Sequence, residues 1–97
     1  MAKISYSRQA LHDLERISDY LTGHGGDALT ALDLIDEAVG ILARHPLIGR
    51  PAECDMHELI ISQGSTGYVE LYSWEADDDA VLVLALRHQK QAGFYEG

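Results

Sequence analysis

The sequence predicts an α+β domain in which one helical hairpin packs against an antiparallel sheet, with the element order β-αα-βββ. Apolar residues recur every three or four positions over residues 8–44, interrupted by the glycine-rich segment 23–26, which indicates two amphipathic helices. After Pro51, apolar runs separated by turn-forming residues indicate strands. Because 97 residues hold only one core, we expect a single domain over 1–97.

The helical half is preceded by a short strand at 4–6, where apolar and polar residues alternate. Ser7 is a suitable N-cap for the first helix, and Asp27 for the second, which should end near Arg44, before Pro46. The apolar stripe of the first helix excludes Asp13 and consists of Leu11, Leu14, Ile17 and Leu21. The corresponding stripe of the second helix is Leu32, Ile35, Val39 and Leu42. A short glycine turn between the helices predicts an antiparallel hairpin.

The second half contains three further predicted strands. They lie at 59–61, 68–72 and 81–86, with hairpin loops at 64–67 and 77–79. The last run is apolar at every position, which predicts that it is the central strand, covered by helices on one side. Tyr68, Tyr72 and Trp74 share one face, and they favour sheet packing over base stacking because no Lys or Arg lies among them. Residues 88–97 are expected to form a short tail with a helical turn.

The charge distribution narrows the functional classes. Seven Lys and Arg against sixteen Asp and Glu give a net charge of −9. Residues 52–97 carry nine acidic and two basic residues, and no Lys or Arg lies between Arg50 and Arg87. Because a nucleic-acid backbone is bound by clustered Lys and Arg, we expect no direct nucleic-acid binding.

Several sequence features indicate the compartment. The lone Cys54 permits no internal disulfide. The N-terminus lacks the apolar segment of a secretory signal. The longest apolar run, 80–86, is too short to span a bilayer. We therefore expect a cytoplasmic protein with no membrane contact.

The residues that often carry chemistry form no recognisable catalytic or metal-binding pattern. The acidic clusters at 53–58 and 77–79 lack the apolar surroundings that tune a carboxyl group for acid–base catalysis. No G-x-S-x-G motif is present. The spacing of the remaining candidate ligands matches no structural zinc site: His45, Cys54, His57 and His88. We expect no catalytic residue, no metal and no cofactor.

Five short motifs, taken in order, resemble the RelE/ParE superfamily of bacterial type II toxins, and most closely its ParE branch. The motifs are Ala10-x-x-Asp13-Leu14-x-x-Ile17-x-x-Tyr20, His45-Pro46-x-x-Gly49-Arg50-Pro51, Glu58-Leu59-Ile60-Ile61, Gly67-Tyr68-Val69-x-Leu71-Tyr72, and Val81-Leu82-Val83-Leu84 leading into Arg87-His88-Gln89. They span about nine-tenths of the chain.

The resemblance implies a small toxin held inactive by a cognate ParD-like antitoxin, as in plasmid-stabilisation systems. ParE-like toxins inhibit DNA gyrase by protein–protein contact. The alternatives are a RelE-like, ribosome-dependent mRNA endoribonuclease and a degenerate, non-toxic module that only binds its antitoxin.

Two departures from the family pattern disfavour the ribonuclease. His57 and Val69 occupy positions at which relatives often carry Arg. Cleavage of RNA must stabilise a negatively charged phosphorane, and this needs positive charge in place. A partly charged imidazole is a poor substitute for guanidinium groups.

The resemblance also suggests two sets of contact residues. The expected target contacts are Arg87, His88, Lys90, Phe94, Tyr95 and His57. The antitoxin is expected to lay a helix along a groove beside Leu14, Ile17 and Leu21 or along the exposed apolar positions of the second helix, with Arg8 and Arg50 pairing with antitoxin carboxylates.

Overall fold

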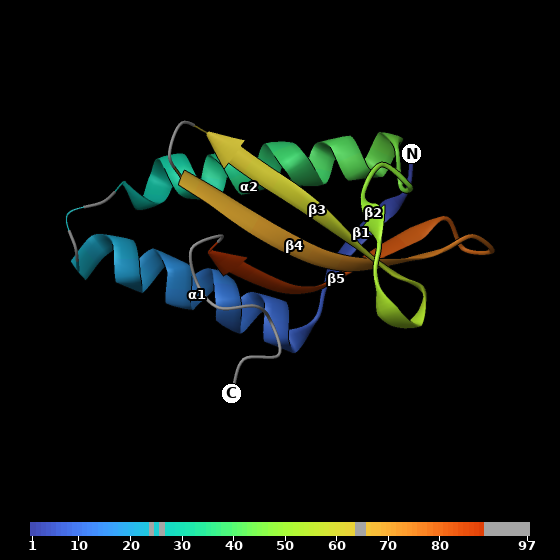
Figure 1. The fold of residues 1–97 in the computed structure, drawn as a ribbon, viewed down its shortest axis with the longest axis horizontal. Coiled ribbons are helices and arrows are strands. Elements are labelled where there is room, and N and C mark those ends of the chain that lie inside the picture. Colours follow the sequence, from blue (N-terminus) through green and yellow to red (C-terminus); the bar gives the residue numbers. More distant parts are fainter. Residues whose placement is uncertain (24, 26, 64–65, 89–97) are drawn as a thin grey trace.

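The computed structural model describes residues 1–23, 25, 27–63 and 66–88. Within these ranges, two helices cover one face of a five-stranded sheet (Figure 1). In chain order the elements are β1 (Lys3–Tyr6), α1 (Arg8–Gly23), α2 (Ala28–Arg44), β2 (Arg50–Pro51), a 3₁₀ turn (Glu53–Asp55), β3 (Met56–Gln63), β4 (Thr66–Glu75) and β5 (Ala80–His88). The predicted α+β class and helical hairpin are confirmed. Of the tail expected at 88–97, His88 ends β5 and residues 89–97 lie outside the described residues.

The sheet differs from the prediction in its size and its centre. Its strand order is β1-β5-β4-β3-β2, with β1 parallel to β5 and the other pairs antiparallel. The three predicted antiparallel strands are confirmed as β3, β4 and β5, but the sheet is larger than predicted, because β1 joins it and the two-residue β2 adds another edge. The central strand is β4 rather than the run 81–86. That run lies inside the sheet between β1 and β4, which accounts for its apolar character.

Local hydrogen bonds fix the ends of α2. Asp27 is the N-cap, and its carboxylate accepts a hydrogen bond from the Thr30 backbone N–H at 3.1 Å. Hydrogen bonds from the side chain and the backbone of Thr30 lower the pKa of Asp27. At the other end, the His45 N–H donates to the Ile41 carbonyl at 2.8 Å, and Pro46 follows. Neither described helix is long and apolar enough to cross a membrane.

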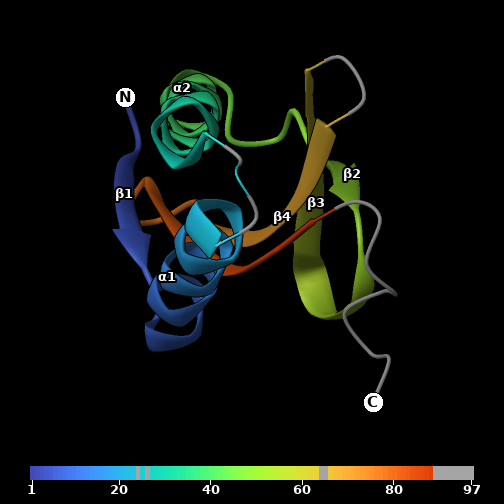
Figure 2. The same cartoon turned by 90° about the vertical axis from the view of Figure 1, so that its left-hand side faces the viewer.

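The core lies between the helical hairpin and the sheet face beneath it (Figure 2). Tyr68 and Tyr72 are fully buried there and Trp74 is half-buried, which confirms their predicted packing role. The predicted stripe of α1 needs one correction, because Leu11 is exposed and Asp13 is fully buried. The buried residues of α1 are Ala10, Asp13 and Ile17.

Candidate functional site

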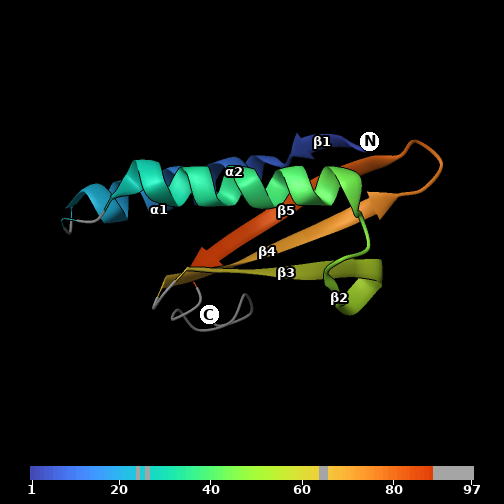
Figure 3. The same cartoon turned by 90° about the horizontal axis from the view of Figure 1, so that it is seen from above.

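One face of the sheet lies away from the helices and is here called the open face (Figure 3). The strand register places the arginines of two family motifs on it. Side chains alternate along a strand, so residues opposite one another across paired strands share a face. Arg50 lies opposite Glu58, and Arg87 lies opposite Val69. Both arginines are therefore placed by β-sheet register, and we take the open face with its Arg87 end as the candidate site.

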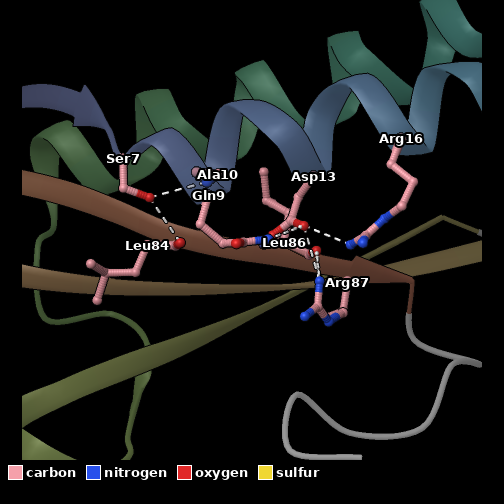
Figure 4. Close-up of polar contacts among 8 residues, drawn as sticks. All are labelled: Ser7, Gln9, Ala10, Asp13, Arg16, Leu84, Leu86 and Arg87. Carbon is pink, nitrogen blue, oxygen red and sulfur yellow. Dashed lines mark hydrogen bonds and ion pairs between the residues drawn. The ribbon is translucent and has the colours of Figure 1, made fainter. Parts of the chain in front are cut away.

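A buried carboxylate on α1 holds Arg87 (Figure 4). The Arg87 Nη1 lies 3.0 Å from Asp13 Oδ1, and the Arg87 side chain is only 24% exposed. The other oxygen of Asp13 accepts a hydrogen bond from the Leu86 backbone N–H at 2.9 Å. Arg16 Nη2 at 2.6 Å and Gln9 Nε2 at 3.0 Å also donate to Asp13. Asp13 thus joins α1 to the end of β5 and fixes the direction of the Arg87 side chain.

Ser7 makes a second connection between α1 and β5. Its hydroxyl donates to the Leu84 carbonyl at 2.9 Å and accepts from the Ala10 backbone N–H at 3.0 Å. Leu84 lies at a bulge, because Tyr72 pairs with Val83 while the neighbouring Leu71 pairs with Ala85. A bulge leaves one residue outside the regular ladder and redirects the strand that follows. The predicted N-cap residue therefore also binds the irregular point of the strand that presents Arg87.

The connector before β3 positions Arg50. The Gly49 backbone N–H donates to the Tyr72 hydroxyl at 2.9 Å. A Cβ atom at Gly49 would lie 2.7 Å from both the Glu58 carbonyl oxygen and the Tyr72 hydroxyl, so only glycine fits. Arg50 follows, with its Nε 3.1 Å from Glu58 Oε1 and its side chain 62% exposed. The close packing at Gly49 therefore explains why this motif has a glycine directly before Arg50.

The two predicted histidines contact buried tyrosines. The His57 ring stacks on Tyr72 with centroids 5.5 Å apart, and the His88 ring meets Tyr68 edge-on at 5.3 Å. Each histidine is half-buried and lies opposite its tyrosine in the β-sheet register, so it belongs to the helix-covered face. His57 and Arg87 therefore lie on different faces of the sheet.

The structure separates the other predicted contact residues. Lys90, Phe94 and Tyr95 lie outside the described residues. Arg8 is exposed at the start of α1. The predicted antitoxin groove consists of residues that contact the protein's own core, with Ile17 buried and the others half-buried: Leu14, Ile17 and Leu21. Their roles in partner binding stay predictions.

The chemistry available on the open face is limited by ion pairing. Arg50 is paired with Glu58, and Arg87 is paired with Asp13. A phosphoryl-transfer transition state is stabilised by cations directed at its developing charge. Both arginines already direct donors at carboxylates of this chain. Among the described residues, no three His, Cys, Asp or Glu side chains are placed to hold a metal ion.

Glu70 is a buried acid that the sequence did not reveal. It lies in β4 beneath the helices, opposite Leu59 and Leu86, and neither carboxyl oxygen has a hydrogen-bond partner in the described structure. Burial raises the pKa of Glu70 to about 7. The pKa of the neighbouring Tyr6 is also raised, first by burial and then by the negative charges of Glu70 and Asp36. The alternation of Tyr68, Glu70 and Tyr72 along one strand is the signal that could have placed Glu70 on the buried face.

Comparisons with known proteins agree with this architecture. The family model for the ParE toxin of the type II toxin–antitoxin system parDE matches residues 4–93. Toxin RelE3 of Caulobacter vibrioides is 33% identical over 89 residues, which cover 91% of this chain and 95% of that protein.

Two solved structures show the same fold at lower identity. A chain of the chromosomal ParDE system of P. aeruginosa superposes with a TM-score of 0.73 at 22% identity, covering 91% of this chain and 96% of that chain. The isolated E. coli RelE toxin superposes with a TM-score of 0.69 at 14% identity, covering 98% and 92%. Since the ParE family model spans almost the whole chain and a RelE toxin is 33% identical across nine-tenths of it, this chain belongs to the RelE/ParE family and is a toxin of the type II toxin–antitoxin class.

Proposed function

We propose that this toxin acts by protein–protein contact with DNA gyrase, and that a ParD-like antitoxin neutralises it. The matching family model and the sequence relative carry the names of the two branches of the family, ParE and RelE. The choice between gyrase inhibition and mRNA cleavage therefore rests on the chemistry of the candidate site.

The pairing of the two open-face arginines is the observation that carries this choice. Asp13 and Glu58 neutralise Arg87 and Arg50, and the second half of the chain has nine acidic and two basic residues. Bringing an mRNA phosphate to this face would require both ion pairs to break in a strongly acidic surrounding. Contact with a protein surface requires no such concentration of positive charge, because apolar and hydrogen-bonding groups supply much of the energy.

An antitoxin partner follows from membership of the toxin class. The solved ParDE system of P. aeruginosa and the RelBE2 complex of Mycobacterium tuberculosis are toxin–antitoxin complexes with chains of this fold. On this chain, the half-buried Leu14 and Leu21 offer apolar surface beside α1. Because the toxin has a net charge of −9, we expect apolar helix packing to supply most of the binding energy.

The decisive experiment compares purified protein in two assays. The first follows DNA supercoiling and cleavage by gyrase, and the second follows transcript integrity in a translating extract. We expect accumulation of cleaved DNA with gyrase and intact transcripts in the extract. We expect Lys90→Ala and Tyr95→Ala to weaken the gyrase effect, whereas Glu15→Gln on the exposed surface of α1 should leave it unchanged.

Each alternative predicts a different outcome. Codon-dependent cleavage of translated mRNA, lost in His57→Ala, would establish the endoribonuclease and overturn the gyrase proposal. Normal growth of cells that express the chain, together with tight antitoxin binding and unaffected gyrase, would establish a degenerate binding module.

A further inference from the structure

An apolar hollow lies beside the connector that carries Arg50, toward the end of the sheet opposite to Arg87. Its volume is about 530 Å³, and it is lined by Arg44, His45, Pro46, Leu47, Ile48 and Trp74. Leu47 and Ile48 are 57% and 53% exposed, although they are large aliphatic residues. Tryptophan and arginine are enriched in interface hot spots, and here they lie next to exposed aliphatic side chains.

The walls of the hollow are held in place before any partner binds. On one side, the Ile48 backbone N–H donates to the His45 carbonyl at 3.1 Å, and the adjacent Gly49 is bound to Tyr72. On the other side, Trp74 Nε1 donates to Asp79 Oδ1 at 3.4 Å. A preorganised surface loses little conformational entropy on binding.

The charges on the two rims of the hollow are opposite. Arg44 and His45 form one rim, at the C-terminal end of α2. Beyond Trp74, the end of β4 and the turn to β5 carry exposed acidic residues: Glu75, Asp77, Asp78 and Asp79. Figures 1 and 3 agree that this turn extends past the end of α2 at the same end of the molecule. The surface is therefore basic on one side, apolar in the middle and acidic on the other.

We propose that this hollow is the interface of a homodimer, formed by two copies of the chain about a two-fold axis. A two-fold axis through an apolar centre places the basic rim of each copy against the acidic rim of the other, so the patch is complementary to itself. Leu47 and Ile48 of each copy then pack beside the partner's Trp74. The net charge of −9 on each copy opposes association over longer distances, and physiological salt screens that repulsion beyond about 8 Å.

Sedimentation velocity of the purified chain in physiological salt tests the dimer. We expect a reversible monomer–dimer equilibrium between about 5 and 200 µM, a range that brackets the weak end of specific association. Leu47→Ser should raise the dissociation constant at least about tenfold, the effect of losing one hot-spot side chain. The matched control is Leu29→Ser, an exposed leucine at the opposite end of α2, which should leave association unchanged.

A charge exchange tests the arrangement of the two copies. Arg44→Glu should weaken the dimer. Adding Asp78→Arg to the same chain should restore it, because the new acidic residue at position 44 of one copy then lies near the new basic residue at position 78 of the other. A monomer at every concentration would overturn the proposal, as would a dimer unaffected by Leu47→Ser. A hollow that binds only the antitoxin would also overturn it. None of these measurements involves gyrase, so their outcome is independent of the proposed function.

Discussion

Asp13 and Glu70 are both fully buried carboxyl groups, but the groups around them differ. Asp13 accepts hydrogen bonds from a backbone N–H, an amide and two guanidinium groups. Glu70 has no hydrogen-bond partner among the described residues. A buried carboxylate is stable only when paired and hydrogen-bonded. Asp13 therefore serves as a charged anchor for Arg87, whereas Glu70 favours the protonated, neutral form.

The Asp13 anchor predicts a large loss of stability when its charge is removed. In Asp13→Asn, the Leu86 N–H keeps an acceptor, but the Arg87 guanidinium loses its ion pair while still largely covered. We expect the free energy of unfolding to fall by about 2–3 kcal/mol, toward the lower end for a broken buried pair because Arg87 is partly hydrated. Urea unfolding measures the change.

The matched control for that substitution is Asp19→Asn, an exposed aspartate on the same helix. An exposed substitution of this kind should change the free energy of unfolding by less than about 0.5 kcal/mol. Equal effects of the two substitutions would show that Asp13 is not the anchor of β5.

At the scale of elements, the sequence predicted those features that arise from local patterns. The spacing of apolar residues identified both helices, and Ser7 and Asp27 were correct as capping residues. Pairings distant in the sequence were missed. The parallel pairing of β1 with β5 depends on contacts between residues near the two ends of the chain, and β2 is too short to show a period.

The sequence also predicted only part of the candidate site, because contacts between residues distant in the chain leave no local pattern. The family motifs pointed to Arg50 and Arg87, and the fold places both on the open face. The partner of Arg87 was not predicted, because Asp13 lies 74 positions away and was excluded from the apolar stripe of the first helix. The buried residues of α1 are spaced three and four positions apart: Ala10, Asp13 and Ile17. This helical spacing would have predicted a buried Asp13 if Leu11 had not been assigned to the core.

Two glycines in neighbouring elements should respond oppositely to alanine. Gly49→Ala places a methyl group against the Glu58 carbonyl and the Tyr72 ring, and we expect a loss of about 1–3 kcal/mol in the free energy of unfolding. Gly40→Ala, on the exposed side of α2, meets no atom within 4 Å and should add about 0.5–1 kcal/mol through helix propensity. Thermal and urea unfolding of both variants measure the difference. A neutral Gly49→Ala would refute the close approach of the connector to β3 and β4.

At the scale of the whole molecule, the helical hairpin and the sheet enclose an acid that folding must keep neutral. The residues that pair with Glu70 in the sheet give it apolar surroundings. Leu59 and Leu86 flank it in the sheet, and the Tyr6 phenol of β1 lies close enough for the charge of Glu70 to raise its pKa. No cation among these neighbours compensates a charge on Glu70. The global stability of the domain should therefore depend on the protonation of this one residue.

The pH dependence follows from the direction of the shift. The pKa of Glu70 rises from 4.5 in the unfolded chain to about 7 in the folded chain, so the folded state binds the proton more tightly. The stabilisation is complete below pH 4.5, is lost as pH rises to about 7, and changes little above that. The total loss is about 3 kcal/mol, of which about 2 kcal/mol falls between pH 5.5 and 8.

Glu70→Gln isolates this contribution, because glutamine has the shape of the neutral acid and does not titrate. Other groups, Asp27 among them, shift the stability of both proteins equally, so the informative quantity is the difference between the two unfolding free energies at each pH. We expect the wild-type chain to approach the variant near pH 5.5 and to become about 2 kcal/mol less stable relative to it by pH 8. A difference that stays constant over this range would mean that Glu70 is hydrated or paired in solution. In that case water reaches the sheet face beneath the helical hairpin, although the tyrosines on either side of Glu70 are fully buried.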